Sequence, residues 1–225
     1  MSIDEKKTEK PTDTDDVAGH ARAVEDIEEP PVDPPEEPPI VVEPPPPQVA
    51  ELAAACVRFV ASRYGVMLDF SPDTLSLVDQ YVADARTEIA AKPQALEVVQ
   101  AAAGAYLGEV MRRAFGGMWF SDGDHDGWRL DMERVYLTFN PIGMAREAIM
   151  LEAAEGWHAH LEMDDAEKPE VERRLSALPE VADTEFYAPT SRFEVVEIAI
   201  DALRAQMIDA GHGDVTFDAE DYQRR

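Results

Sequence analysis

The chain has 225 residues, with 47 acidic against 20 basic side chains and a net charge of −27. This charge repels nucleic-acid phosphates and anionic lipid headgroups, so we expect neither DNA, RNA nor a membrane surface as a partner. A basic protein or a divalent cation is electrostatically easier to bind, and solubility alone is the alternative reason for the charge. The single cysteine, Cys56, excludes an intramolecular disulfide. Because we find no apolar signal core and no run of roughly 18 apolar residues, we expect a cytoplasmic protein.

Residues 1–48 differ in composition from the rest of the chain. They hold 11 of the 17 prolines, 14 acidic and 4 basic residues, and no Phe, Tyr, Trp, Leu or Cys. So little apolar surface does not offset the roughly 1–2 kcal/mol per residue that ordering costs, so we expect a disordered acidic tail. Its proline pairs favour a semi-rigid spacer, with a ligand for an aromatic-lined groove as the alternative. Residues 49–211 are expected to form one domain, and residues 212–225 a loose acidic C-terminal tail.

Helical periodicity begins directly after the tail. A first helix is predicted from Pro47 to about Ser62, with Cys56 on its apolar stripe as a small core residue. A second helix is predicted after Ser71, which is a suitable N-cap because Pro72 follows at the first helical position. Both helices have one apolar and one polar face, so we expect them to pack against a common core.

A third helix is predicted from Pro93 to Phe115 and is apolar almost all round, which places it at the centre of the domain. Gly104 and Gly108 lie four residues apart on it and leave room for another backbone. Glu109 lies in a row of apolar residues. It is either a general acid or base or half of a structural ion pair with Arg112 or Arg113, and we prefer the ion pair because no catalytic partner is recognisable.

The spacing of apolar residues changes from helical to strand-like after residue 117. Aromatic and β-branched segments at 118–120, 128–130 and 135–139 predict a three-stranded antiparallel meander. Its aromatic side chains form either a core layer or an exposed binding face: Trp119, Trp128, Tyr136 and Phe139.

Three helices are predicted after the meander. One follows the Asn140-Pro141 cap and ends near Ala154, a short one covers residues 169–178, and the last starts at Ser191 with Glu194 completing a capping box. Residues 155–190 show the weakest pattern. The fold class is therefore α+β, with about five helices around a small three-stranded sheet.

An acidic loop carries the sharpest local motif. Asp122, Asp124 and Asp126, followed by Gly127 and Glu133, match the calcium-loop pattern D-x-[DN]-x-[DN]-G-x5-E. In such a loop alternating carboxylates converge on a hard cation and the last Glu completes the shell. However, strands are expected beside this loop instead of EF-hand helices, and Asp and Gly also suit a plain hairpin turn. Both interpretations stay open.

The chain offers little other metal-binding chemistry. His158 and His160 are too few to form a metal site by themselves, and two exposed histidines in a loop are the simpler interpretation.

Five residues carry a resemblance to a known group: Gly104, Tyr106, Gly108, Glu109 and Trp119. A Gly-x-Tyr-x-Gly-Glu helix, then a Trp-bearing strand and a meander ending in a Pro-led helix, resembles a group of uncharacterised small bacterial domains over about residues 72–155. The resemblance implies an α+β fold and a bacterial source. It implies no activity and no catalytic residue, so the five are expected to have structural or interaction roles.

The sequence shows neither a paired nucleophile and base nor a phosphate-binding glycine loop. We therefore expect a non-enzymatic intracellular module for protein interaction or regulation, with no cofactor. The identity of its protein partner and its oligomeric state stay open. The alternatives are a calcium-responsive module that uses the loop from Asp122 to Glu133, and a small enzyme that uses Glu109.

Overall fold

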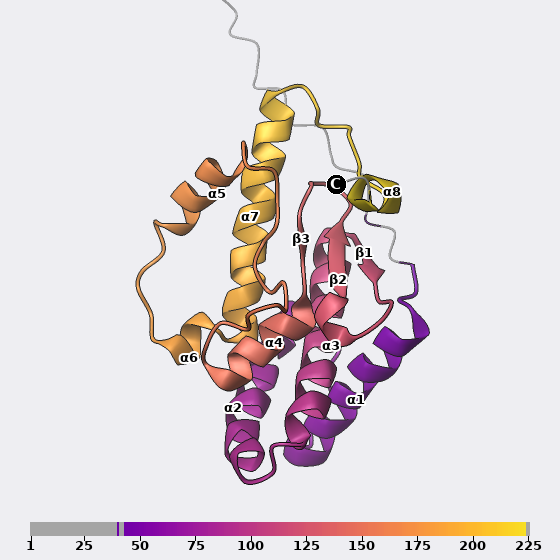
Figure 1. Cartoon of the computed structure of the whole chain (residues 1–225), viewed down its shortest axis with the longest axis vertical. Helices are drawn as coiled ribbons and strands as arrows, with labels where there is room; N and C mark the ends of the chain where they lie inside the picture. The colour runs from indigo at the N-terminus through magenta and orange to yellow at the C-terminus, as the bar shows by residue number, and fades with distance from the viewer. Residues whose placement is uncertain (1–39, 41–42, 224–225) are drawn as a thin grey trace, which may run out of the picture. The chain divides into compact units, whose positions relative to one another are not determined.

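The computed structural model describes residue 40 and residues 43–223 (Figure 1). Within this part, eight α-helices and one three-stranded antiparallel sheet confirm the predicted α+β class. Two helices that were not predicted are short, since α6 (Asp183–Phe186) has four residues and α8 (Ala219–Gln223) has five. The predicted disordered tail, residues 1–48, lies mostly outside the described residues, and its last two residues already belong to the first helix.

The first three helices supply a large part of the core. They are α1 (Pro47–Tyr64), α2 (Leu75–Ala91) and α3 (Ala95–Phe115), and Figure 1 shows α3 with α2 on one side and α1 on the other. Every residue of α3 from Gln100 to Arg112 is buried, as its nearly continuous apolar surface predicts. The helix therefore occupies the central position.

The turn into α2 differs from the predicted cap. A short 3-10 turn, η1 (Pro72–Thr74), precedes the helix, and the Ser71 hydroxyl caps nothing. Instead the Asp69 carboxylate accepts a hydrogen bond from Ser71 N at 2.9 Å, and the Thr74 hydroxyl donates to Ser71 O at 3.0 Å. Side chains on either side of Ser71 therefore bind its backbone groups, and its hydroxyl does not act as the predicted cap.

The sheet follows directly on α3. Its strands are β1 (Gly117–Phe120), β2 (Arg129–Met132) and β3 (Thr138–Phe139), paired antiparallel in that order. Gly117 lies opposite Met132, and Phe120 lies opposite Arg129. A short 3-10 turn, η2 (His125–Gly127), sits in the connection between β1 and β2. The third strand is shorter than predicted because residues 133–137 form a turn, although Val135 and Leu137 in it are fully buried.

The helix after the sheet has the predicted cap. In α4 (Pro141–Met150) the Asn140 side chain accepts hydrogen bonds from Ile142 N at 2.9 Å and Gly143 N at 3.1 Å. The helix ends four residues before the predicted end at Ala154, because Leu151 takes a left-handed conformation with φ of 56°.

The remaining elements are α5 (Lys168–Leu175), which matches the predicted short helix, and the long α7 (Pro189–Asp209). The predicted start of α7 at Ser191 with a Glu194 capping box is wrong, because the helix begins at Pro189 without a local side-chain cap. The Asp79 carboxylate on α2 accepts hydrogen bonds from Thr190 N at 3.1 Å and from the Thr190 hydroxyl at 2.6 Å. A tertiary contact therefore replaces the local cap.

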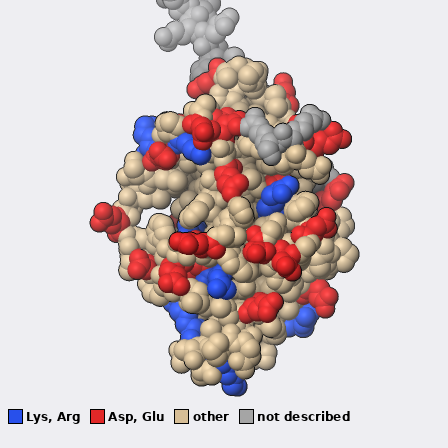
Figure 2. Space-filling model, viewed as in Figure 1, with Lys and Arg blue, Asp and Glu red and all other residues tan. Residues whose placement is uncertain are grey.

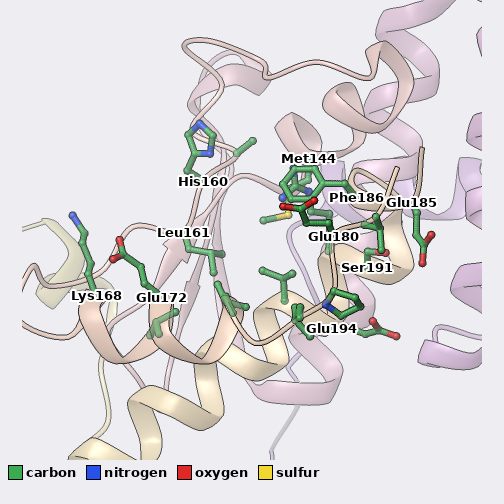
Figure 3. Close-up of a pocket in the computed structure, with 18 of the residues that line it drawn as sticks. Met144, His160, Leu161, Lys168, Glu172, Glu180, Glu185, Phe186, Ser191 and Glu194 are labelled. Carbon is green, nitrogen blue, oxygen red and sulfur yellow. The ribbon is translucent and has the colours of Figure 1, made fainter. Parts of the chain in front are cut away.

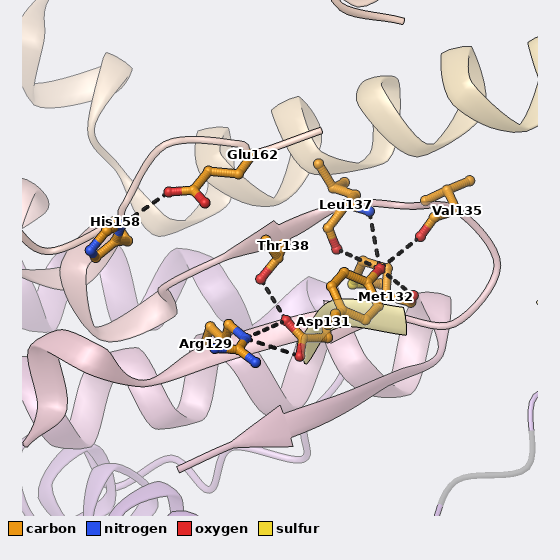
Figure 4. A network of polar contacts seen from close by, with 9 residues as sticks. Arg129, Asp131, Met132, Val135, Leu137, Thr138, His158 and Glu162 are labelled. Carbon is orange, nitrogen blue, oxygen red and sulfur yellow. Dashed lines mark hydrogen bonds and ion pairs between the residues drawn. The ribbon is translucent and has the colours of Figure 1, made fainter. Parts of the chain in front are cut away.

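The C-terminal segment is anchored, which corrects the prediction of a loose tail over 212–225 as far as residue 223. Tyr222 in α8 is 7% exposed, and its hydroxyl lies 2.7 Å from Met132 O and 3.0 Å from Val135 O (Figure 4). The same hydroxyl accepts a hydrogen bond from Leu137 N at 3.1 Å. One side chain thus satisfies the backbone of the turn between β2 and β3.

Candidate functional site

Two glycines of α3 allow close contact with other elements. A Cβ atom at Gly104 would lie 2.7 Å from Pro141 O and 2.8 Å from Ile142 N, at the start of α4. A Cβ atom at Gly108 would overlap the Trp119 ring, lying 2.5 Å from its Cη2 atom and closer still to Cζ2, and would lie 2.9 Å from the Pro141 ring. Both positions therefore require the absence of a side chain, so that α4 and the indole can lie against α3.

Glu109 stands at the centre of a buried ion pair. Its side chain is 1% exposed, and its two oxygens accept hydrogen bonds from Arg112 Nε at 2.7 Å and Arg112 Nη2 at 2.9 Å. The Trp119 indole N–H donates to Glu109 at 2.9 Å, and the more exposed Arg113 lies 3.7 Å away. A buried carboxylate with a bidentate arginine and a further donor has its charge compensated within the fold.

Tyr106 ties α3 to the turn before α2. Its hydroxyl accepts a hydrogen bond from Phe70 N at 3.0 Å and lies 2.7 Å from the Thr74 hydroxyl. Its ring stacks on that of Phe70, with the centroids 4.8 Å apart. Phe70 has a left-handed backbone with φ of 65°, which is costly for a bulky residue, so these contacts stabilise an otherwise unfavourable conformation.

The acidic loop does not bring its four candidate ligands together. Asp122, Asp124 and Asp126 lie in the connection from β1 to β2, whereas Glu133 follows β2 at the opposite end of the ladder. Glu133 instead lies beside Gly116, 3.4 Å from the position of a Cβ atom there. Within residues 40 and 43–223, no three His, Cys, Asp or Glu side chains are placed to hold a metal ion.

The surroundings of the loop also differ from a calcium site. Asp124 and Asp126 line a polar hollow of about 500 Å³ together with Arg146, whose positive charge opposes a cation. Strands flank the loop on both sides, and Asp124 O accepts a hydrogen bond from Gly127 N at 3.0 Å within the turn. The geometry supports the interpretation as a hairpin connection.

The remaining candidates are aromatic residues of the sheet region and an exposed histidine. Trp128 and Phe139 are buried, at 4% and 1% exposure, so they belong to the core layer. Tyr136 stacks on Tyr222 with ring centroids 4.8 Å apart. His158 is exposed and its Nδ1 lies 3.0 Å from a Glu162 carboxylate oxygen, within the short segment that runs beside β3 (Figure 4).

Asp131 on β2 is a second buried carboxylate, with a different environment. Its oxygens accept hydrogen bonds from Arg129 Nε at 3.0 and 3.1 Å and from the Thr138 hydroxyl at 2.6 Å (Figure 4). Burial raises the pKa of the Asp131 carboxyl above its usual range, and the contacts with Thr138 and Arg129 oppose this rise.

A further concave surface lies in the part of the chain whose sequence pattern was weakest. A cavity of about 880 Å³ lies among α4, α5, α6 and the start of α7, and we call it the α5–α7 groove (Figure 3). Most of its buried and half-buried lining residues are apolar: Met144, Ala159, Leu161, Met163, Val171, Leu175 and Val195. Figure 2 shows the hollow beneath the connection from α5 to α6.

Large apolar side chains stand exposed at this groove. Leu178, Val181 and Phe186 line it and are 45%, 40% and 48% exposed. Three such residues at one concavity are more informative than single exposed apolar residues, because clustered apolar surface commonly marks an interaction site.

Charged groups surround the apolar lining. Glu172 projects from α5, Glu180 and Glu185 lie in the segment that follows it, and Glu194 lies on α7 (Figure 3). All four are exposed. Lys168 and Arg192 are the cations at the groove.

One known family matches a continuous segment of the chain. Residues 34–134 match the model of a family of unknown function (DUF6278). The match confirms the expectation of an uncharacterised family. No curated protein and no solved structure matches the chain.

The DUF6278 segment and the groove occupy different parts of the chain. Gly104, Tyr106, Gly108, Glu109 and Trp119 all lie within the DUF6278 segment, and their contacts described above are internal to the fold. The groove is lined by residues from 144 to 195, beyond the end of the DUF6278 match. The family model therefore covers the structural centre of the domain and leaves the groove outside it.

Sequence reasoning missed the groove. Its residues lie mainly in 155–190, where apolar side chains follow neither helical nor strand spacing. One signal was available, since Leu178, Val181 and Phe186 occur in an acidic stretch where apolar residues have no local partner.

The described residues contain no helix that is both long and apolar enough to cross a membrane.

Proposed function

We propose that this protein is a non-enzymatic cytoplasmic interaction module that receives an apolar segment of a protein partner in the α5–α7 groove. The observation that supports this proposal is the convergence of Leu178, Val181 and Phe186, each at least 40% exposed, on one apolar cavity. Fully burying one such side chain is worth roughly 1.5–3 kcal/mol. Covering three half-exposed ones therefore offers a partner a substantial share of a binding free energy.

The non-enzymatic part of the proposal is supported by the contacts of Glu109. Both of its oxygens accept hydrogen bonds from Arg112, and the Trp119 indole donates to one of them. A general acid or base needs a carboxyl that reaches substrate, and this one is 1% exposed. Its contacts are those of a structural ion pair.

Site-directed variants of the full chain test the proposal. The double variant Leu178→Asp/Val181→Asp places charge in the groove at positions that are already exposed, so we expect it to stay folded. Val98→Asp is the control for an aspartate introduced outside the groove, because Val98 is 56% exposed on α3 and does not line the groove. Each immobilised chain is incubated with a bacterial cytoplasmic extract, and the retained proteins are compared.

We expect a protein that the wild type and the Val98→Asp chain retain equally and that the groove double variant loses. Equal retention by the groove variant would place the contact elsewhere and reject the proposal. Retention of the same protein by a peptide of residues 1–48 would assign the interaction to the tail. Thermal melting of all three chains establishes that lost binding does not reflect unfolding.

A further inference from the structure

The four carboxylates at the α5–α7 groove take no part in the ion pairs and side-chain hydrogen bonds of the described residues. Within the described part of the chain, neither an ion pair nor a side-chain hydrogen bond joins any of these groups to another residue: Glu172, Glu180, Glu185 and Glu194. All four are exposed. Their negative charge is therefore available to a bound molecule.

The two cations at the groove are already paired. Lys168 Nζ lies 2.6 Å from an Asp165 oxygen, and Arg192 Nη2 lies 2.7 Å from a Glu147 oxygen. The Arg192 guanidinium also lies over the Phe186 ring, 4.8 Å from its centroid. Because acidic residues that do not line the groove compensate both cations, the electrostatic character of the groove is set by its four carboxylates.

The apolar residues line the cavity, and the glutamates stand on the elements that border it. Buried Met144 and Val171 and the half-buried Val195 line the cavity, while Glu172 and Glu194 stand on different helices (Figure 3). A helix that lays an apolar stripe into such a groove carries its flanking positions toward both sides. An extended strand would direct its polar side chains away from the groove.

We propose that the occupant of the α5–α7 groove is a basic amphipathic helix of a partner protein, with leucine-like side chains on the apolar lining and Lys or Arg beside the four glutamates. This inference rests on the proposed function and specifies the chemistry of the partner. Charge complementarity decides the choice, because the chain's net charge of −27 disfavours both an acidic segment and an anionic lipid surface.

Two synthetic peptides of about 15 residues test the inference, each labelled for fluorescence anisotropy. Both carry leucines at helical spacing. The first has lysines on both flanks of the apolar face, and the second has glutamines at those positions, which have a similar helix propensity. Binding to the full chain is measured at low salt and again at about 0.5 M salt, where surface charges are largely screened.

Two quadruple variants distinguish attraction of the lysine peptide to the groove glutamates from attraction to the net charge of the whole chain. The groove variant replaces its four glutamates by glutamine: Glu172, Glu180, Glu185 and Glu194. The control replaces four other exposed glutamates and changes the net charge equally: Glu51, Glu97, Glu152 and Glu155. A difference between these two chains therefore reports the position of the charges.

We expect the lysine peptide to bind the wild type about tenfold more tightly than the glutamine peptide at low salt, and the difference to shrink at high salt. The groove variant should lose about tenfold for the lysine peptide, and the control less than about threefold. Equal losses in both variants would mean attraction to the overall charge and would overturn the inference.

The remaining outcomes distinguish the two proposals. Equal binding of both peptides, abolished by Leu178→Asp/Val181→Asp, keeps the groove as the interaction site and rejects a basic partner. Tight binding of the lysine peptide that this double variant leaves unchanged rejects the groove itself. Failure of both peptides to bind also overturns the inference, and the extract experiment then decides the proposed function.

Discussion

Replacing Gly104 by alanine tests the contact between α3 and α4 that organises the core. A methyl group at this position would lie 2.7 Å from Pro141 O and 2.8 Å from Ile142 N. Comfortable separations of non-bonded heavy atoms are about 3.5 Å, and Ile142 Cα would lie closer still, so α4 must move by about 1 Å. Both neighbours are backbone atoms at the capped start of a helix, so rotating a side chain does not relieve the clash.

The expected size of the effect follows from two opposing contributions. Inserting an extra methyl into a packed core costs about 1–3 kcal/mol. Alanine within a helix is favoured over glycine by about 1 kcal/mol, which offsets part of that cost. We therefore expect Gly104→Ala to lower the free energy of unfolding by about 1–2 kcal/mol and the melting temperature by about 2–8 °C.

Urea denaturation followed by circular dichroism measures the change, with Gly127→Ala as the control. Gly127 has open space around the position of its Cβ atom and no positive φ, so alanine there should be nearly neutral. An unchanged or higher stability of Gly104→Ala would refute the close approach of α3 and α4.

Four further predictions concern buried polar groups. Glu109→Gln should lower the free energy of unfolding in urea by about 3 kcal/mol, because it leaves an arginine buried without its counter-ion. The control Arg113→Gln, whose side chain is 40% exposed, should lower it by less than about 1 kcal/mol. Equal losses would contradict this. Tyr222→Phe should cost about 1–2 kcal/mol and expose the C-terminal segment to protease; unchanged protease resistance would argue against the anchor. Burial raises the pKa of the Cys56 thiol to about 12, so a thiol reagent at about pH 8 should modify it in urea and not in the native protein. Burial also raises the pKa of the Asp131 carboxyl. The protonated Asp131 carboxyl contributes its full stability below the ordinary Asp pKa of about 3.9, and this contribution is lost as pH rises through the raised pKa of the folded state. Asp131→Asn should therefore gain stability relative to wild type in denaturation measurements as pH rises above about 4, and the opposite trend would refute this sign.

Features with a local physical cause could be predicted from the sequence. The helix Ala95–Phe115 is central because its surface is apolar nearly all round, and no distant residue is needed to see this. The cap at Asn140 was likewise predictable, because its side chain bonds to the backbone N–H groups two and three residues ahead. Cys56 was correctly assigned to the core, being 0% exposed.

Features that depend on contacts between residues far apart in the sequence could not be predicted. The start of α7 is fixed by Asp79, which is 111 residues from Thr190 along the chain. The apolar side chains of the groove follow no period, so their convergence appears only when α5 and α7 are in place. The motif from Asp122 to Glu133 predicted a site that does not form, although its sequence pattern is complete. The pairing of β1 with β2 places the three aspartates at one end of the ladder and Glu133 at the other.

The Tyr222 anchor has a consequence for the order of folding. Its hydroxyl contacts the backbone of a turn about 90 residues earlier, at Met132 O. Closing so long a loop is entropically costly and contributes to a high contact order. During synthesis the helices α1 to α3 can assemble first from contacts of shorter range, but the turn between β2 and β3 acquires its hydrogen-bond partner only after α8 has been made. The sheet therefore reaches its final form only after α8 has been translated.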